Sequence, residues 1–90
     1  MQFEWDAAKA ASNVLKHGID FNEASTVFAD SLSATGRDRD HSIREARFLT
    51  FGLSSKGREL AVSHTDRGGV VRIISARAAT RKEKQIYEKN

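Results

Sequence analysis

The sequence predicts an α+β fold with the element order β-α-α-β-β-β-α, built as one domain over residues 1–90. Three observations lead to this order: helical periodicity early in the chain, alternating apolar residues in three later segments, and a helix-capping pattern near the end. A chain of 90 residues has room for a single hydrophobic core, since one core typically organises about 50 to 200 residues.

The first helix is expected to follow a short strand at residues 2–5. Asp6 suits its N-cap and Gly18 its C-terminal end. At about 100° per residue, such a helix has one apolar and one polar side. The apolar side holds Ala7, Ala8, Ala11, Val14 and Leu15, and the opposite, exposed side holds Lys9, Asn13, Lys16 and His17.

The next segment predicts a second helix, from Asp20 or Asn22 to about Ala29. Residues 31–35 give a weak strand signal that the order above does not count. Residues 36–45 are strongly charged and predict a loop.

The second half of the chain predicts three strands and a last helix. The strands lie at residues 47–54, around 60–64 and at 70–76, and short turns between them force antiparallel pairing. Thr80 and Glu83 have the spacing of a capping box before the helix. The helices can then cover one face of the sheet and leave the other, with its basic side chains, open to a ligand.

Composition narrows the class of protein. The chain has no cysteine, which excludes disulfides, thiolate metal sites and cysteine nucleophiles. No apolar run approaches 18 residues, and the opening residues carry charge where a signal peptide needs an apolar stretch. We therefore expect a cytoplasmic protein without a membrane segment.

Charge is distributed unevenly along the chain. Residues 1–45 hold 5 Lys/Arg and 8 Asp/Glu, a balance of −3, whereas residues 46–90 hold 10 and 4, a balance of +6. Such asymmetry favours a polyanion-binding surface in the second half, and the alternative is an ordinary solvated surface.

Two groups of basic residues are candidates for phosphate binding. The first is the polar side of the first helix, which also fits the plain exterior of an amphipathic helix. The second runs from the last strand into the last helix and comprises Arg72, Arg77, Arg81, Lys82 and Lys84. Arg72 and Arg77 fall on opposite strand faces by parity unless the backbone bulges between them.

The histidines do not predict a metal site. His17, His41 and His64 are far apart in the sequence and show no ligand spacing. His64 shares a strand face with apolar residues, which favours a hydrogen-bonded histidine at the edge of the core. No metal, nucleotide or other cofactor is expected.

Two blocks of residues resemble a known family. The first contains Phe3-Glu4-Trp5-Asp6, Lys9-Ala10, Asn13, Lys16-His17-Gly18, Glu23-Ala24 and Val27-Phe28-Ala29-Asp30; the second contains Arg72-Ile73-Ile74-Ser75-Ala76-Arg77, Ala79-Thr80-Arg81, Glu83 and Tyr87. In this order they resemble the BrnT family of bacterial type II toxins. The resemblance departs at Ala7 and Ser31, where relatives commonly have proline, at Ala78, where they have a basic residue, and at Lys84, where arginine is frequent.

The resemblance implies a RelE-like fold and a ribonuclease toxin that inhibits translation and arrests growth. It also implies neutralisation by a BrnA-like antitoxin with a ribbon-helix-helix DNA-binding part. Because such units dimerise on DNA, two toxins are expected on one antitoxin dimer, with operator DNA bound through the antitoxin.

The leading hypothesis is a metal-independent endoribonuclease in which the 2′-hydroxyl of RNA attacks the adjacent phosphate. Charge stabilisation and proton transfer are then needed. The residues assigned are Arg77 and Arg81 for phosphate stabilisation, His17 or Tyr87 for proton transfer, and Lys9, Lys16 and Arg72 for binding the RNA backbone. Tyr87 can serve as a base only if cationic neighbours lower its pKa. The alternative is a noncatalytic nucleic-acid-binding module or an antitoxin-binding corepressor.

Overall fold

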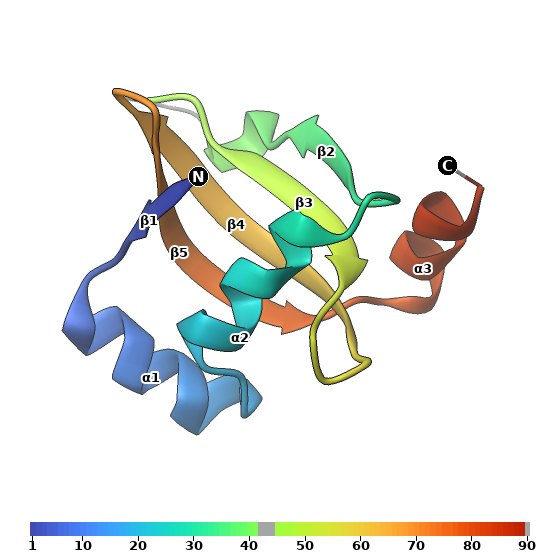
Figure 1. Ribbon diagram of the computed structural model, residues 1–90, viewed down its shortest axis with the longest axis horizontal. Coiled ribbons are helices and arrows are strands. Elements are labelled where there is room, and N and C mark those ends of the chain that lie inside the picture. The colour runs from blue at the N-terminus through green and yellow to red at the C-terminus, as the bar shows by residue number, and fades with distance from the viewer. Residues whose placement is uncertain (42–44, 90) are drawn as a thin grey trace.

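A computed structural model describes residues 1–41 and 45–89 as a five-stranded sheet with three α-helices (Figure 1). The strands are β1 (Gln2–Glu4), β2 (Ala34–Arg37), β3 (Phe48–Leu53), β4 (Glu59–Arg67) and β5 (Val70–Ala78). Their order across the sheet is β1-β5-β4-β3-β2.

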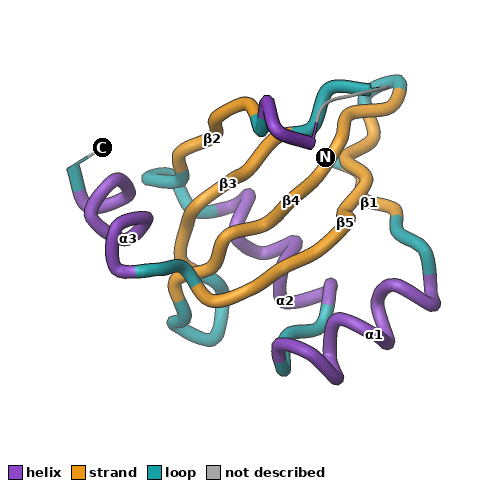
Figure 2. Tube along the Cα trace, turned by 180° about the vertical axis from the view of Figure 1, so that it is seen from behind, coloured by secondary structure: helices purple, strands orange, loops and turns teal. Residues whose placement is uncertain are grey.

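The three helices pack against different parts of this sheet (Figures 1 and 2). They are α1 (Ala7–His17), α2 (Phe21–Thr26) and α3 (Arg81–Glu88), with short 3₁₀ turns η1 (Val27–Ala29) and η2 (Arg39–His41). α2 and η1 cover one face from β5 to β3, α1 lies along β5, and α3 packs beside β3. No helix within the described residues is long and apolar enough to cross a membrane.

The core lies between α2 and the covered face of the sheet. Its fully buried apolar members are Ile19, Phe21, Ala24, Val27, Leu60, Val62, Ile73 and Ala76. Burying a side chain the size of leucine or phenylalanine contributes about 1.5–3 kcal/mol, so each large member of this cluster stabilises the fold on that scale.

The helix boundaries follow the capping residues expected from the sequence. The Asp6 carboxylate accepts from the Lys9 backbone N–H at 3.0 Å, and Gly18 ends α1 with a φ of 69°, which glycine adopts without a steric penalty. Asp20 caps α2, and Thr80 and Glu83 form a reciprocal capping box on α3.

The sheet differs from the expectation in two ways. The weak strand signal is a real fifth strand, shifted to Ala34–Arg37, and β1 pairs parallel with β5, so the sheet is not wholly antiparallel. β2 has little burial of its own, and its pairing with β3 includes a hydroxyl contact of 2.7 Å between Thr35 and Thr50. Tertiary pairing therefore overrides weak local preference here. Residues 42–44 of the expected loop lie outside the described residues.

α1 is rotated relative to the sequence expectation. Asn13, assigned to the exposed side, is only 5% exposed, whereas Leu15, assigned to the apolar side, is 88% exposed. The Asn13 amide donates to the carbonyl oxygens of Ile19 and Ala76 and accepts from the Ala76 N–H. Periodicity identifies which residues share a face, but these three hydrogen bonds decide which face turns inward.

Candidate active site

A bulge in β5 aligns the two arginines of this strand. Ser63 pairs with Ser75 and the next residue of β4, His64, pairs with Ile73, which leaves Ile74 as the extra residue. Ile73 and Ala76 are buried beneath the covered face. Arg72 and Arg77 therefore both lie on the opposite, open face. Strand alternation allowed this only if the backbone bulged between them.

The open face carries a hollow of about 370 Å³ beside the bulge. Its lining residues are Asp38, Asp40, Arg47, Leu49, Ser63, Ile74, Ser75 and Arg77. Asp38, Asp40 and Arg47 were not assigned from the sequence, because only the pairing of β2 with β3 brings the segment around 38–40 over the sheet. The signal that could have found Arg47 is its position at the start of the alternating strand.

The Arg77 guanidinium is held by a carboxylate of α3. Its Nη1 and Nη2 donate to Glu83 Oε1 and Oε2 at 2.6 and 2.9 Å. This bidentate pair lowers the pKa of Glu83 to about 2 and raises the pKa of Arg77. Since a guanidinium has five N–H donors, this carboxylate fixes the group while leaving donors for a second anion.

A second hollow, of about 170 Å³, lies between α1 and β5. It is lined by Lys9, Ser12, Asn13, Lys16, His17, Ile74 and Ser75. Ile74 and Ser75 line both hollows, so the bulge separates the α1 cations from Arg47 and Arg77. A chain of phosphates that crosses the bulge would meet Lys9 and Lys16 on one side, and Arg77 beside Asp38 and Asp40 on the other.

Arg72 lies on the other side of the bulge from Arg77, two residues before Ile74. Its Nη1 donates to Glu4 of β1 at 2.5 Å, and its side chain is about a quarter exposed. The pair fastens β1 to β5 and leaves the guanidinium at the margin of the open face.

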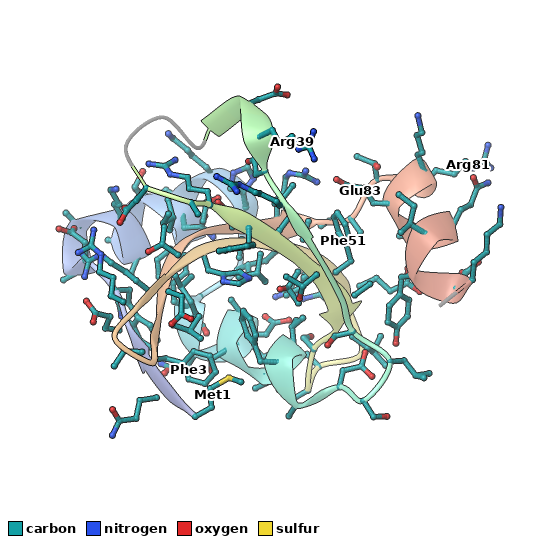
Figure 3. The ribbon with its side chains drawn as sticks, turned by 90° about the horizontal axis from the view of Figure 1, so that it is seen from above. Met1, Phe3, Arg39, Phe51, Arg81 and Glu83 are labelled. Carbon is teal, nitrogen blue, oxygen red and sulfur yellow. The ribbon has the colours of Figure 1, made fainter. Side chains whose placement is uncertain are left out.

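Arg81 is not beside Arg77. It lies on the outer side of α3, in a hollow lined by Lys84, Gln85 and Glu88, while Glu83 points from the same helix toward the sheet (Figure 3). Arg77 and Arg81 are therefore not brought together, because Arg77 lies in β5 and α3 begins only after the Thr80 cap.

Tyr87 is engaged with an acid, not with cations. Its hydroxyl donates to Asp30 Oδ2 at 2.7 Å, and this hydrogen bond to a carboxylate raises the pKa of Tyr87 to about 12. Asp30 also accepts from the backbone N–H groups of Leu32 and Leu53. The condition set for Tyr87 as a base was a lowered pKa, so the geometry argues against that role and favours a contact that docks α3.

His64 is structural. It is 7% exposed, its Nε2 lies 2.7 Å from Thr50 Oγ1, and it packs against Phe28 and Phe48. Burial lowers its pKa to about 4. The expected hydrogen-bonded histidine at the edge of the core is confirmed.

A further buried acid, Glu23, was named in the sequence only among the residues that carry the family resemblance. Its carboxylate accepts from Ser54 and from both Nε and Nη2 of Arg58, and these partners lower the pKa of Glu23. The cluster ties α2 to the turn between β3 and β4 and has no opening toward either hollow beside the bulge. Within residues 1–41 and 45–89, no three His, Asp or Glu side chains gather in a way that would hold a metal ion.

Comparison with known proteins agrees with this fold. The chain is similar to the crystal structure of the Brucella abortus ribonuclease toxin BrnT, with a TM-score of 0.71 at 23% identity over 90% of this chain and 99% of the other. No curated protein sequence matches it significantly. The family model described as "Ribonuclease toxin, BrnT, of type II toxin-antitoxin system" matches residues 5–83. The chain therefore belongs to the BrnT family of ribonuclease toxins of type II toxin–antitoxin systems.

Proposed function

We propose that this toxin is a metal-independent endoribonuclease that cuts RNA at the β5 bulge. The observation that carries the proposal is the Arg77 guanidinium, fixed by Glu83 on one side of the bulge, with Lys9, Lys16 and His17 on the other. An RNA strand across the bulge would place one phosphate near Arg77 and its neighbour near α1.

In the proposed reaction the 2′-oxygen of RNA bonds to the adjacent phosphorus and the bond from phosphorus to the 5′-oxygen breaks. The 2′-hydroxyl proton passes to a base, and the leaving 5′-oxygen takes up a proton. His17 is our candidate for proton transfer, because its imidazole lines the hollow beside the bulge with Lys9 and Lys16 and an imidazole can donate or accept a proton. The free donors of Arg77 stabilise the added charge on the phosphate.

The remaining assigned cations act at a distance from the scissile phosphate. Lys9 and Lys16 bind the RNA backbone beside His17, and Arg72 extends the basic path along β5. Arg81, on the outer side of α3, contacts RNA outside the reacting phosphate and contributes less than Arg77.

The chemistry is tested with purified toxin and two matched RNA substrates. Cleavage should persist in a metal chelator and leave a 2′,3′-cyclic phosphate or its hydrolysis product. A substrate with 2′-deoxy at the scissile nucleotide should resist cutting there and be cut elsewhere. Cutting at the deoxy position, or activity that returns only with added divalent metal, would exclude this mechanism.

In cells, expression without antitoxin should reduce translation and arrest growth. The partner that restrains it is a BrnA-like ribbon-helix-helix antitoxin, bound as two toxins on one antitoxin dimer, with operator DNA contacted through the antitoxin. Light scattering of the purified complex measures the stoichiometry, and DNA binding of each component alone shows which one carries the affinity.

One observation favours the alternative of a noncatalytic binder or corepressor. Two donors of Arg77 are already occupied by the Glu83 carboxylate, whose pKa lies near 2. RNA could therefore bind this surface without breaking the pair between Arg77 and Glu83. RNA binding without any cleavage by purified, folded toxin would support this alternative.

A further inference from the structure

α1 presents an apolar stripe to solvent along its whole length. Val14 and Leu15 are 46% and 88% exposed. The stripe consists of Ala7, Ala8, Ala11, Val14 and Leu15, all exposed. At about 100° per residue these five residues span roughly 120° of the helix surface. A single exposed leucine is ordinary, but a continuous stripe on one helix is what a protein normally buries.

Buried hydrogen bonds hold the stripe outward. Asn13, on the inner side of α1, satisfies both the N–H and the C=O of Ala76 at the edge of β5 and the C=O of Ile19. Turning the stripe inward would leave these groups unpaired in the core, which costs about 1–3 kcal/mol for each. The stripe is therefore a fixed surface of the folded toxin.

Charge around the stripe indicates what can cover it. The residues of α1 include Lys9, Lys16 and His17 and no acid. The two lysines lie on one flank of the helix, separated from the stripe by Ser12. Two copies of α1 packed against each other would bring like charges together. A partner with apolar residues flanked by acids would instead gain both burial and complementary charge.

Small residues allow such a partner to come close. Three of the five stripe residues are alanine, Ala7, Ala8 and Ala11, and Val14 and Leu15 rise beside them at the C-terminal end. A surface of this shape suits the packing of a second helix, whose axis would lie about 8–10 Å from that of α1.

We propose that the apolar stripe of α1 is the docking surface for the antitoxin, bound through an amphipathic helix whose apolar side is flanked by acidic residues. The proposal rests on the antitoxin partner given under the proposed function and not on the ribonuclease mechanism. Lys9 and Lys16 line the hollow that we assign to RNA, so a helix seated on the stripe would place acidic groups at its mouth. Docking and inhibition would then use adjacent surfaces.

The test uses purified toxin and its purified cognate antitoxin. Leu15→Glu and Ala11→Glu should each weaken antitoxin binding at least 30-fold, because they place negative charge and desolvation cost in the contact. Leu15→Lys should weaken binding less than Leu15→Glu, because the partner is acidic there. The matched control is Leu32→Glu, at a residue that is 57% exposed and lies outside α1, and it should change binding less than threefold.

The same variants separate this proposal from the proposed enzymatic function. Leu15→Glu should keep its RNA cleavage and toxicity while the antitoxin no longer neutralises it. Binding is measured independently of cleavage, so a toxin that fails to cut RNA still tests the surface. If Leu15→Glu fails to fold by circular dichroism, Ala11→Glu decides. Binding at wild-type affinity by the folded glutamate variants would overturn the proposal, as would a free toxin dimer that Leu15→Glu dissociates.

Discussion

α1 and α3 lie on different sides of the sheet and are fastened to it by different chemistry. α1 is held by the buried, uncharged amide of Asn13. α3 has no buried residue and is held by the Arg77–Glu83 ion pair and the Tyr87–Asp30 hydrogen bond. The difference teaches that α1 is anchored to the sheet through one buried side chain, whereas α3 is a surface element whose contacts also arrange the candidate site.

The strongest test of this comparison is Asn13→Ala. It removes all three bonds to Ile19 and Ala76 and leaves buried groups unpaired, so the free energy of unfolding should fall by about 3 kcal/mol. Urea denaturation followed by circular dichroism measures this loss. Asn22→Ala, at an exposed position of α2, serves as the control and should change stability by about 0.5 kcal/mol or less. Equal losses in the two variants would show that α1 is not fixed through Asn13.

Arg77→Ala tests α3, whose ion pair with Arg77 is also part of the candidate active site. Loss of the guanidinium should reduce RNA cleavage about 100-fold, the effect of removing one preorganised charge-stabilising donor. Arg81→Ala, on the outer side of α3, should reduce cleavage about 10-fold or less. Single-turnover cleavage at saturating toxin separates this loss from weaker RNA binding. An Arg81 effect as large as that of Arg77 would place the scissile phosphate on α3 instead of the open face.

Acid should weaken the sheet before it weakens the contact of α3. The pKa of His64 is lowered from its ordinary value of 6.5 to about 4, so the fold binds fewer protons there than the unfolded chain. This stability is complete above pH 6.5 and is lost as the pH falls toward 4, by about 2 kcal/mol at pH 5. Glu83, with a pKa of about 2, stays ionised in this range, and its contribution is lost only as the pH falls from about 4.5 through 2.

Urea midpoints between pH 7.5 and 5 measure this dependence, and His64→Phe is the matched variant because it keeps the packing against Phe28 and Phe48. Its midpoint should vary less with pH than that of the wild type. An unchanged pH dependence in His64→Phe would assign the acid sensitivity to another group.

The sequence predicted the elements with strong local signals. Asp6, Gly18, Asp20 and Thr80 ended or began helices where expected, because capping is a local interaction between a side chain and nearby backbone. The strand β2 was predicted only as a weak signal at residues 31–35, and the parallel pairing of β1 was not predicted, since both pairings depend on partners far along the chain.

The candidate site was predicted only in part, because it too depends on contacts between segments far apart in the chain. Lys9, Lys16, His17 and Arg77 do gather about the bulge, but the sequence left open whether that bulge exists. The inward side of α1 was assigned wrongly, because one buried asparagine outweighs the apolar pattern. The Asp30 partner that fixes Tyr87 lies in a distant segment, so no local pattern could have assigned its role.

Tyr87→Phe gives the smallest expected effect and separates docking from catalysis in α3. The variant keeps the ring and removes only the hydroxyl that donates to Asp30 at 2.7 Å. Without this partly exposed hydrogen bond, amide exchange in residues 81–88 should quicken about fivefold, while the global unfolding midpoint moves little. Cleavage should stay within about threefold of wild type across pH 6–9, because a phenol whose pKa is raised to about 12 holds its proton throughout this range. A loss of cleavage of 100-fold or more, with exchange in α3 unchanged, would instead return Tyr87 to the role of proton-transfer residue and leave α3 fastened chiefly by Glu83.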